Sequence, residues 1–233
     1  MNRGIFGDRT QGTFNELSSR PAAAAERNVI SAAKKNMTRR ILIVVGHPDS
    51  EPRRFCRALA QAYAEGAESA GHRVRRIDIA ELDFPLLRTM EEFEHGTLAP
   101  AIRDAAQAIA EAEHIVFVFP LWLGTMPALL KGFLEQVMRP GTAFAYPGKA
   151  KGGFAETLLK GRSARIVVTM GMPAFFYRLW YLGHGLAGMR RNILNFVGIS
   201  PVRETLFGMV GSVDDAKRRL WLAKMRRLGA KAV

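Results

Sequence analysis

Four short runs of consecutive hydrophobic residues stand out along the chain. They cover residues 41–45, 115–119, 166–169 and, more weakly, 202–207. Unbroken runs of β-branched and aromatic residues are typical of strands covered on both faces, as in a parallel sheet between two layers of helices. A fifth segment, residues 72–79, alternates polar and apolar residues, which predicts a strand at the edge of the sheet.

Segments with the periodicity of amphipathic helices lie between these runs. They cover residues 53–70, 99–113, 127–138, 183–196 and 213–228. This alternation predicts one α/β domain with a doubly wound parallel sheet of five strands and helices on both faces. Placing the three most apolar strands at the centre gives the spatial order 2-1-3-4-5. Because ligands bind where the winding of such a sheet reverses, we expect the site in the loops after residues 45, 119 and 169.

The first of these loops, residues 46–55, leads into a predicted helix. Free backbone N–H groups and the helix dipole favour an anion there, and His47, Ser50 and either Arg53 or Arg54 could add hydrogen-bond donors. An ordinary capped helix, with Asp49 or Ser50 near the cap, is the alternative. The loop lacks the Walker pattern of ATP-binding proteins.

The second and third loops combine glycines with large apolar side chains. In the second, Trp122 stands beside Gly124, which provides an exposed backbone edge and an apolar wall for a flat heteroaromatic ring. The alternative is that Trp122 packs beneath the next helix. In the third, Gly171 permits close approach of a ligand to the backbone, and the nearby Tyr177 and His184 bring polar groups that more often have structural roles.

Together these segments resemble the NAD(P)H:quinone oxidoreductase family of flavodoxin-like-fold flavoproteins, over roughly residues 39–210. The strongest likeness is Phe-Pro-Leu, then bulky residues, then PALLKGF at residues 127–133. His47-Pro48 is similar to the start of the family's phosphate loop, although this loop is longer and has Phe55-Cys56 where Phe-Asn is common. Thr169 and the glycine after it are similar to the loop that meets the flavin pyrimidine.

The resemblance implies a set of site residues. The expected flavin-binding residues are His47, Ser50, Arg53, Phe55, Pro120, Leu121, Trp122, Leu123, Gly124, Thr169, Gly171 and Met172. In relatives of the mammalian quinone reductase type, a Tyr eight residues after the Thr and a later His-Gly assist hydride transfer. This points to Tyr177 and His184 as catalytic residues.

The implied activity is transfer of hydride from NAD(P)H through flavin N5 to a quinone-like acceptor, with FMN or FAD bound. The resemblance also implies a homodimer, and the aromatic run at residues 175–182 has the composition of an interface. A regulatory flavoprotein subunit of a membrane transport system, such as potassium efflux, is the alternative. A one-electron flavodoxin carrier is disfavoured, because the chain is basic and lacks that family's Ser/Thr-Gly-rich phosphate cradle.

Another motif, residues 183–188, fits the G-x-G-x-x-G dinucleotide fingerprint, with Glu204 at the distance of a ribose contact. Such a fingerprint normally opens the first strand-to-helix turn, whereas this one comes late in the chain. We therefore disfavour a Rossmann-type site.

The net charge of +13 is concentrated at the ends, since residues 1–40 and 212–233 each carry an excess of five positive charges. Neither end interleaves aromatic with basic residues, so we predict no nucleic-acid partner. Membrane association through the basic last helix is possible but not favoured. The single Cys56 excludes an internal disulfide and a Cys-based zinc cluster, and we expect a cytoplasmic protein without a metal. Residues 1–37 are expected to form a flexible basic extension, and 38–233 the flavin-binding domain.

Overall fold

A computed structural model of the chain describes residues 38–146 and 155–233. The extension predicted for residues 1–37 therefore lies outside the described residues. Within them, no helix has both the length and the apolar character needed to cross a membrane.

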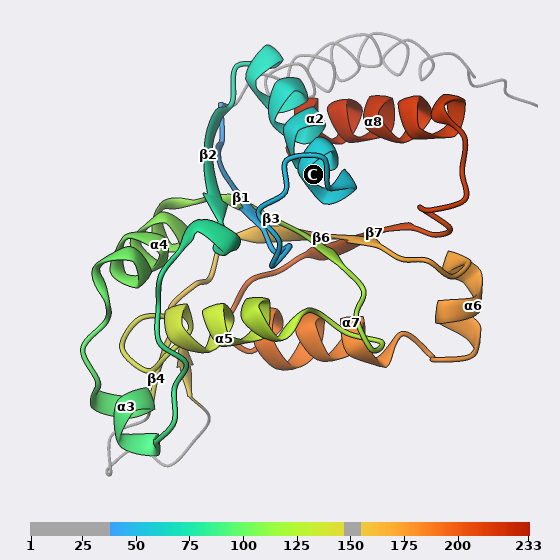
Figure 1. Cartoon of the computed structure of the whole chain (residues 1–233). Helices are drawn as coiled ribbons and strands as arrows, with labels where there is room; N and C mark the ends of the chain where they lie inside the picture. Colours follow the sequence, from blue (N-terminus) through green and yellow to red (C-terminus); the bar gives the residue numbers. More distant parts are fainter. Residues whose placement is uncertain (1–37, 147–154) are drawn as a thin grey trace, which may run out of the picture. The chain divides into compact units, whose positions relative to one another are not determined.

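Five parallel strands form the central sheet in the order β2-β1-β3-β6-β7 (Figure 1). The strands are β1 (Arg40–Val45), β2 (Arg73–Asp78), β3 (His114–Pro120), β6 (Ser163–Thr169) and β7 (Val202–Phe207). Numbered among these five alone, the order is 2-1-3-4-5, so the predicted fold class and topology are confirmed. In β1 and β3 the hydrophobic runs are buried on both faces, whereas β2 at the edge is largely exposed and only its Ile77 is buried.

Helices cover both faces of the sheet (Figure 1). On one face lie α2 (Phe55–Ser69) and α8 (Asp215–Ala230), which pack on Ile43, Val116 and Val118. On the other lie α4 (Pro100–Glu111), α5 (Ala128–Val137), α7 (His184–Gly188) and the π-helix that continues it, Met189–Asn195. The side chains that alternate with the first set, such as Val44 and Phe117, point into this second core.

The structure differs from the predicted elements in the last third of the chain and in the connections. Residues 183–196 were expected to form one helix and instead form α7 followed by the π-helix. The aromatic run at residues 175–182 lies outside every predicted helix, yet its first part belongs to α6 (Ala174–Leu179), with Pro173 as the N-cap residue. The structure also contains elements that were not predicted: α3 (Met90–His95), a 3₁₀ turn at Ile79–Glu81 and the short antiparallel pair β4 (Phe144–Ala145) and β5 (Glu156–Thr157). These elements are too short for a periodic pattern to reveal them.

Candidate functional site

Three loops meet at the carboxyl ends of the central strands. We call them the β1 loop (residues 46–54), the β3 turn (residues 122–125) and the β6 loop (residues 170–173). Backbone hydrogen bonds continue the sheet beyond its strands, from Gly46 N–H to the Val118 carbonyl at 2.8 Å and from Leu121 N–H to the Thr169 carbonyl at 2.8 Å. The loops predicted to form the site are therefore neighbours, at the point where the winding of the sheet reverses.

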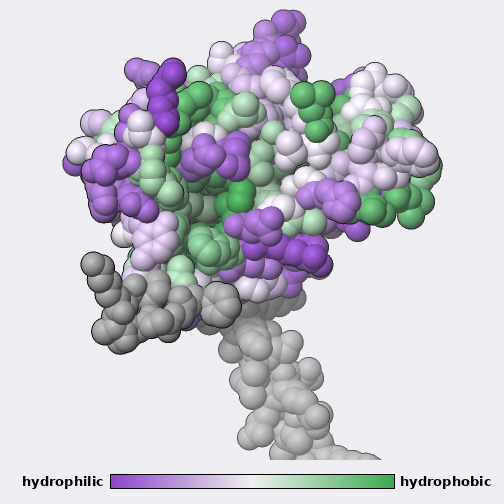
Figure 2. Space-filling view, turned by 90° about the horizontal axis from the view of Figure 1, so that it is seen from below, coloured by the Kyte–Doolittle hydropathy of each residue, from purple (hydrophilic) through white to green (hydrophobic). Residues whose placement is uncertain are grey.

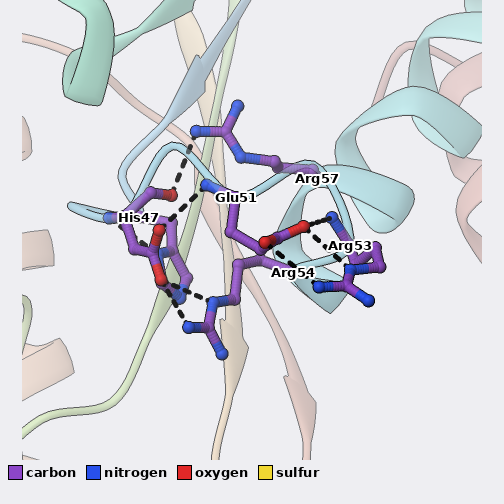
Figure 3. Close-up of polar contacts among 6 residues, drawn as sticks. His47, Glu51, Arg53, Arg54 and Arg57 are labelled. Carbon is purple, nitrogen blue, oxygen red and sulfur yellow. Dashed lines mark hydrogen bonds and ion pairs between the residues drawn. The ribbon is translucent and has the colours of Figure 1, made fainter.

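Side chains within the β1 loop order its backbone (Figure 3). The Asp49 N–H donates to His47 Nδ1 at 3.0 Å, and the Glu51 N–H donates to Asp49 Oδ1 at 2.9 Å. The Arg57 guanidinium, from the first turn of α2, donates to the Asp49 carbonyl at 3.1 Å and pairs with Asp78 at the end of β2. These contacts tie the loop to both α2 and the neighbouring strand.

The two arginines at the end of the β1 loop are each paired with a carboxylate of the same loop (Figure 3). Arg54 Nε donates to Asp49 Oδ2 at 2.7 Å, and Arg53 Nε donates to Glu51 Oε1 at 2.9 Å. The Glu51 N–H and Arg54 lower the pKa of Asp49, and Arg53 lowers the pKa of Glu51. Both carboxylates are therefore charged at neutral pH.

His47 is buried, with 8% of its surface exposed. Because its Nδ1 accepts the Asp49 N–H, the neutral ring carries its proton on Nε2, an assignment that follows from the hydrogen-bond geometry. Burial and the nearby Arg54 lower the pKa of His47, so the neutral form dominates at pH 7. The residue therefore offers one N–H donor, beside the Trp122 ring, whose centroid lies 6.2 Å away.

Helix α2 begins at Phe55, two residues later than predicted, and no side chain caps its N-terminus among the described residues. The Phe55 side chain packs on Trp221 of α8, with ring centroids 6.0 Å apart, and the Arg218 guanidinium lies 5.6 Å from the centre of its ring. The next residue, Cys56, is buried and lies 3.2 Å from Thr169 Oγ1. Of the predicted contacts, the Phe55 ring and the Thr169 hydroxyl therefore already have protein partners.

The β3 turn exposes its residues to solvent. Leu123 and Gly124 both have positive φ angles, 47° and 81°, and hydrogen bonds of 2.9 and 3.0 Å between Trp122 and Thr125 close the turn. Trp122 is 48% exposed, so the alternative in which it packs beneath the next helix is wrong. Leu123 projects fully into solvent, and the preceding residues Pro120 and Leu121 are partly buried.

Tyr177 and Gly185 contact the backbone of the β3 turn and hold it in place. The Tyr177 hydroxyl donates to the Gly124 carbonyl at 3.0 Å, and its ring is buried. A Cβ on Gly185 would lie 2.1 Å from the same carbonyl oxygen and 2.9 Å from Thr125 Cα, so the start of α7 touches the turn backbone to backbone. Burial raises the pKa of Tyr177, which keeps its hydroxyl protonated. Sequence reasoning missed Gly185, because no local pattern reports this contact.

The remaining predicted site residues lie on or near these loops and differ in their exposure to solvent. Gly171 is exposed, and the Met172 carbonyl accepts the Met209 N–H at 3.1 Å, which joins the β6 loop to the segment after β7. His184 is exposed at the first position of α7, and Ser50 is exposed on the β1 loop. The fingerprint-like residues 183–188 follow α6 rather than a strand. The carboxylate of Glu204 is bound by Arg178 and Arg190 and not directed at a ribose site.

The donor set of the three loops suits a flat ring that carries a phosphate. The N-terminus of α2 and His47 Nε2 supply donors for an anion. Among the described residues, a Cβ on Gly124 or Gly171 would meet no atom within 4 Å, so both backbones are open to a planar group. The half-exposed Trp122 provides the apolar wall.

A large hydrophobic surface lies beside these loops on α6 and the residues that follow it, at the right-hand end of Figure 2. Its exposed members are Phe175, Phe176, Leu179, Trp180, Tyr181 and Leu182, and the most exposed, Leu179 and Trp180, each show 73% of their surface. We call this set the α6 surface. Soluble monomers rarely expose such a contiguous apolar patch.

Known proteins share this architecture over most of the chain. A model of the family described as "Flavodoxin-like fold" matches residues 39–228. An uncharacterized NAD(P)H oxidoreductase of Haemophilus influenzae is 31% identical over 76% of this chain and 88% of the relative. The mouse ribosyldihydronicotinamide dehydrogenase (quinone) is 26% identical over 82% of this chain and 90% of the relative. The solved NAD(P)H:quinone oxidoreductase of Methanothermobacter marburgensis superposes with a TM-score of 0.67 at 24% identity, over 83% of this chain and 96% of that one, and shows the shared fold.

Proposed function

The chain is an oxidoreductase of the flavodoxin-like fold family, related to NAD(P)H:quinone oxidoreductases, and from this premise we propose that it reduces a quinone-like acceptor with NAD(P)H through a bound flavin. One observation carries the proposal: the β1 loop, β3 turn and β6 loop lie next to one another. In the described part of the chain they bring together the N-terminus of α2, which no side chain caps, and the open backbones of Gly124 and Gly171. When bound, the flavin, FMN or FAD, would accept hydride at N5 and pass it to the acceptor.

The β1 loop would hold the flavin phosphate. The backbone N–H groups at the start of α2, including that of Phe55, point out of the helix and attract an anion. His47 Nε2 would add one neutral N–H donor from a buried position. Ser50 and Arg53 lie exposed on the same loop and would approach the phosphate from solvent.

The β3 turn and β6 loop would hold the ring. Trp122 would pack along it, and backbone N–H groups at Gly124 and Gly171 would donate to its polar edge, where negative charge develops during reduction. We propose that Tyr177 and His184 assist hydride transfer beside the ring. The bond from Tyr177 to the Gly124 carbonyl supports an additional positioning role, because it fixes the turn on which the ring would lie.

We also propose that two copies of the chain associate through the α6 surface and close the site together. The exposed aromatic side chains support this, since aromatic residues are enriched in the buried centres of interfaces. Trp180→Glu should then give a monomer in gel filtration at micromolar concentration. A wild-type chain that already elutes as a monomer would contradict the dimer. The expected cytoplasmic location stays a prediction.

The visible spectrum during anaerobic reduction tests the proposed reaction. The protein is loaded with flavin, mixed with NADPH and then with menadione. We expect rapid bleaching of the flavin band and its return when the quinone is added. Flavin that binds but is not bleached would favour a regulatory flavoprotein over a reductase. If the protein binds no flavin, the proposal is wrong and the likeness to the family extends only to the fold.

A further inference from the structure

We propose that Asp49 and Glu51 compete with the flavin phosphate for the arginines of the β1 loop and thereby weaken the binding of phosphorylated flavins. The inference rests on the proposed flavin function and concerns residues of the same site. It makes the flavin an exchangeable ligand whose affinity is limited by carboxylates that belong to the loop itself.

The geometry shows that both arginines are already engaged (Figure 3). Arg54 places Nε and a terminal nitrogen on Asp49 Oδ2. Arg53 contacts both carboxylate oxygens of Glu51, at 2.9 and 3.3 Å, through Nε and a terminal nitrogen. A phosphate that recruits either guanidinium must take it from a charged partner two or five residues away in sequence.

The charge balance of the loop leads to the same conclusion. Arg53, Arg54 and Arg57 are matched by Glu51, Asp49 and Asp78, and His47 is neutral at pH 7 because its pKa is lowered. The β1 loop and the first turn of α2 together carry three arginines, yet with these partners they present no net charge to an incoming phosphate. The carboxylates also repel that anion directly, because they carry the same sign of charge. Unlike the arginines, they have no proton to donate to it.

Conservative substitutions remove the negative charges and the ion pairs with the arginines, and they keep the backbone contact within the loop. Asp49→Asn preserves the Oδ1 acceptor for the Glu51 N–H, and Glu51→Gln preserves the length of that side chain. Glu65→Gln is the matched control. Glu65 lies on α2, outside the β1 loop, and is paired with Arg226 at 2.8 Å, so Glu65→Gln makes the same change in net charge as each single variant but away from the loop.

The experiment titrates each protein with FMN and with riboflavin and follows the quenching of flavin fluorescence. We expect the Kd for FMN to fall about two- to fivefold in each single variant and about tenfold in the double variant, as the strength of exposed ion pairs suggests. Riboflavin, which lacks the phosphate, should bind all the proteins equally. High salt should reduce the difference between variant and wild type for FMN, because it screens exposed charges. Glu65→Gln should behave like the wild type.

The outcomes separate this inference from the function on which it rests. FMN binding that is unchanged or weaker in the variants would overturn the inference and leave the flavin function standing, since the carboxylates would then be ordering the loop. Equal tightening for FMN and riboflavin would also overturn it, because the effect would not involve the phosphate. Failure of every protein to bind either flavin would remove the proposed function and this inference together.

Discussion

Replacing Gly185 with alanine should disrupt the β3 turn. The new Cβ would lie 2.1 Å from the Gly124 carbonyl oxygen and 2.9 Å from Thr125 Cα, whereas carbon atoms pack favourably at about 3.5–4.0 Å. Both obstacles are backbone or Cα atoms, so no side-chain rotation can relieve the clash. The start of α7 must therefore withdraw by about 1 Å, and overpacking of this kind typically costs about 1–3 kcal/mol.

Gly188→Ala provides the matched control for this substitution. Gly188 ends the same helix with φ −60° and ψ −51°, and a Cβ there would meet no atom within 4 Å. Alanine should be tolerated at this position or raise stability by up to about 1 kcal/mol through its higher helix propensity. The two variants make the same chemical change and differ only in the contact with the turn.

Thermal unfolding and FMN titration together test the reasoning. A cost of 1–3 kcal/mol corresponds to a fall in Tm of about 3–10 °C for a chain of this size, so Gly185→Ala should show a fall in that range. Its affinity for FMN should drop about tenfold, the equivalent of about 1.4 kcal/mol, because the displaced turn carries Gly124. Gly188→Ala should keep the affinity for FMN and keep or slightly raise the Tm. A Gly185→Ala protein with wild-type Tm and affinity would show that α7 does not press on the turn.

Three further predictions use buried polar groups. Tyr177→Phe should lower stability by about 1 kcal/mol, the net value of one hydrogen bond, and should reduce quinone turnover while flavin stays bound; unchanged turnover would remove the residue from the catalytic list. Cys56 should resist iodoacetamide in the folded protein, since burial raises the pKa of its thiol to about 11, and rapid labelling of native protein would contradict this. Burial lowers the pKa of His114 to about 3, so only the unfolded chain takes up this proton between about pH 6.5 and 3. Stability should therefore fall on acidification, by about 2 kcal/mol between pH 7 and 5 from this residue, and denaturant titrations of His114→Gln should show a correspondingly smaller loss.

The central sheet could be predicted because its strands are buried on both faces. In β1 and β3 nearly every position must be apolar, so the hydrophobic run marks the strand and also places it at the centre. The segment around α6 gives no such signal. Most of its large side chains are exposed, and Tyr181 stacks on the buried Tyr177. The segment therefore lacks the regular spacing of apolar residues that predicts a helix, although part of it forms the short helix α6.

The position of the site followed from topology, but the role of each residue depends on which hydrogen bonds its side chain has already made. Thr169 illustrates this. Its place at the end of a central strand puts it beside the three loops, yet its hydroxyl is engaged by Cys56, which is 113 residues away in sequence, and its carbonyl by Leu121. Arg53 was expected to bind phosphate, and its guanidinium is held by Glu51. A motif can therefore identify the loop that meets a ligand, whereas the free donors on that loop emerge only when every internal partner is known. Among the described residues of the β1 loop, those donors lie mainly on the backbone and on His47, because the arginines are held by carboxylates of the same loop. Removing these carboxylates should free the arginines and strengthen phosphate binding.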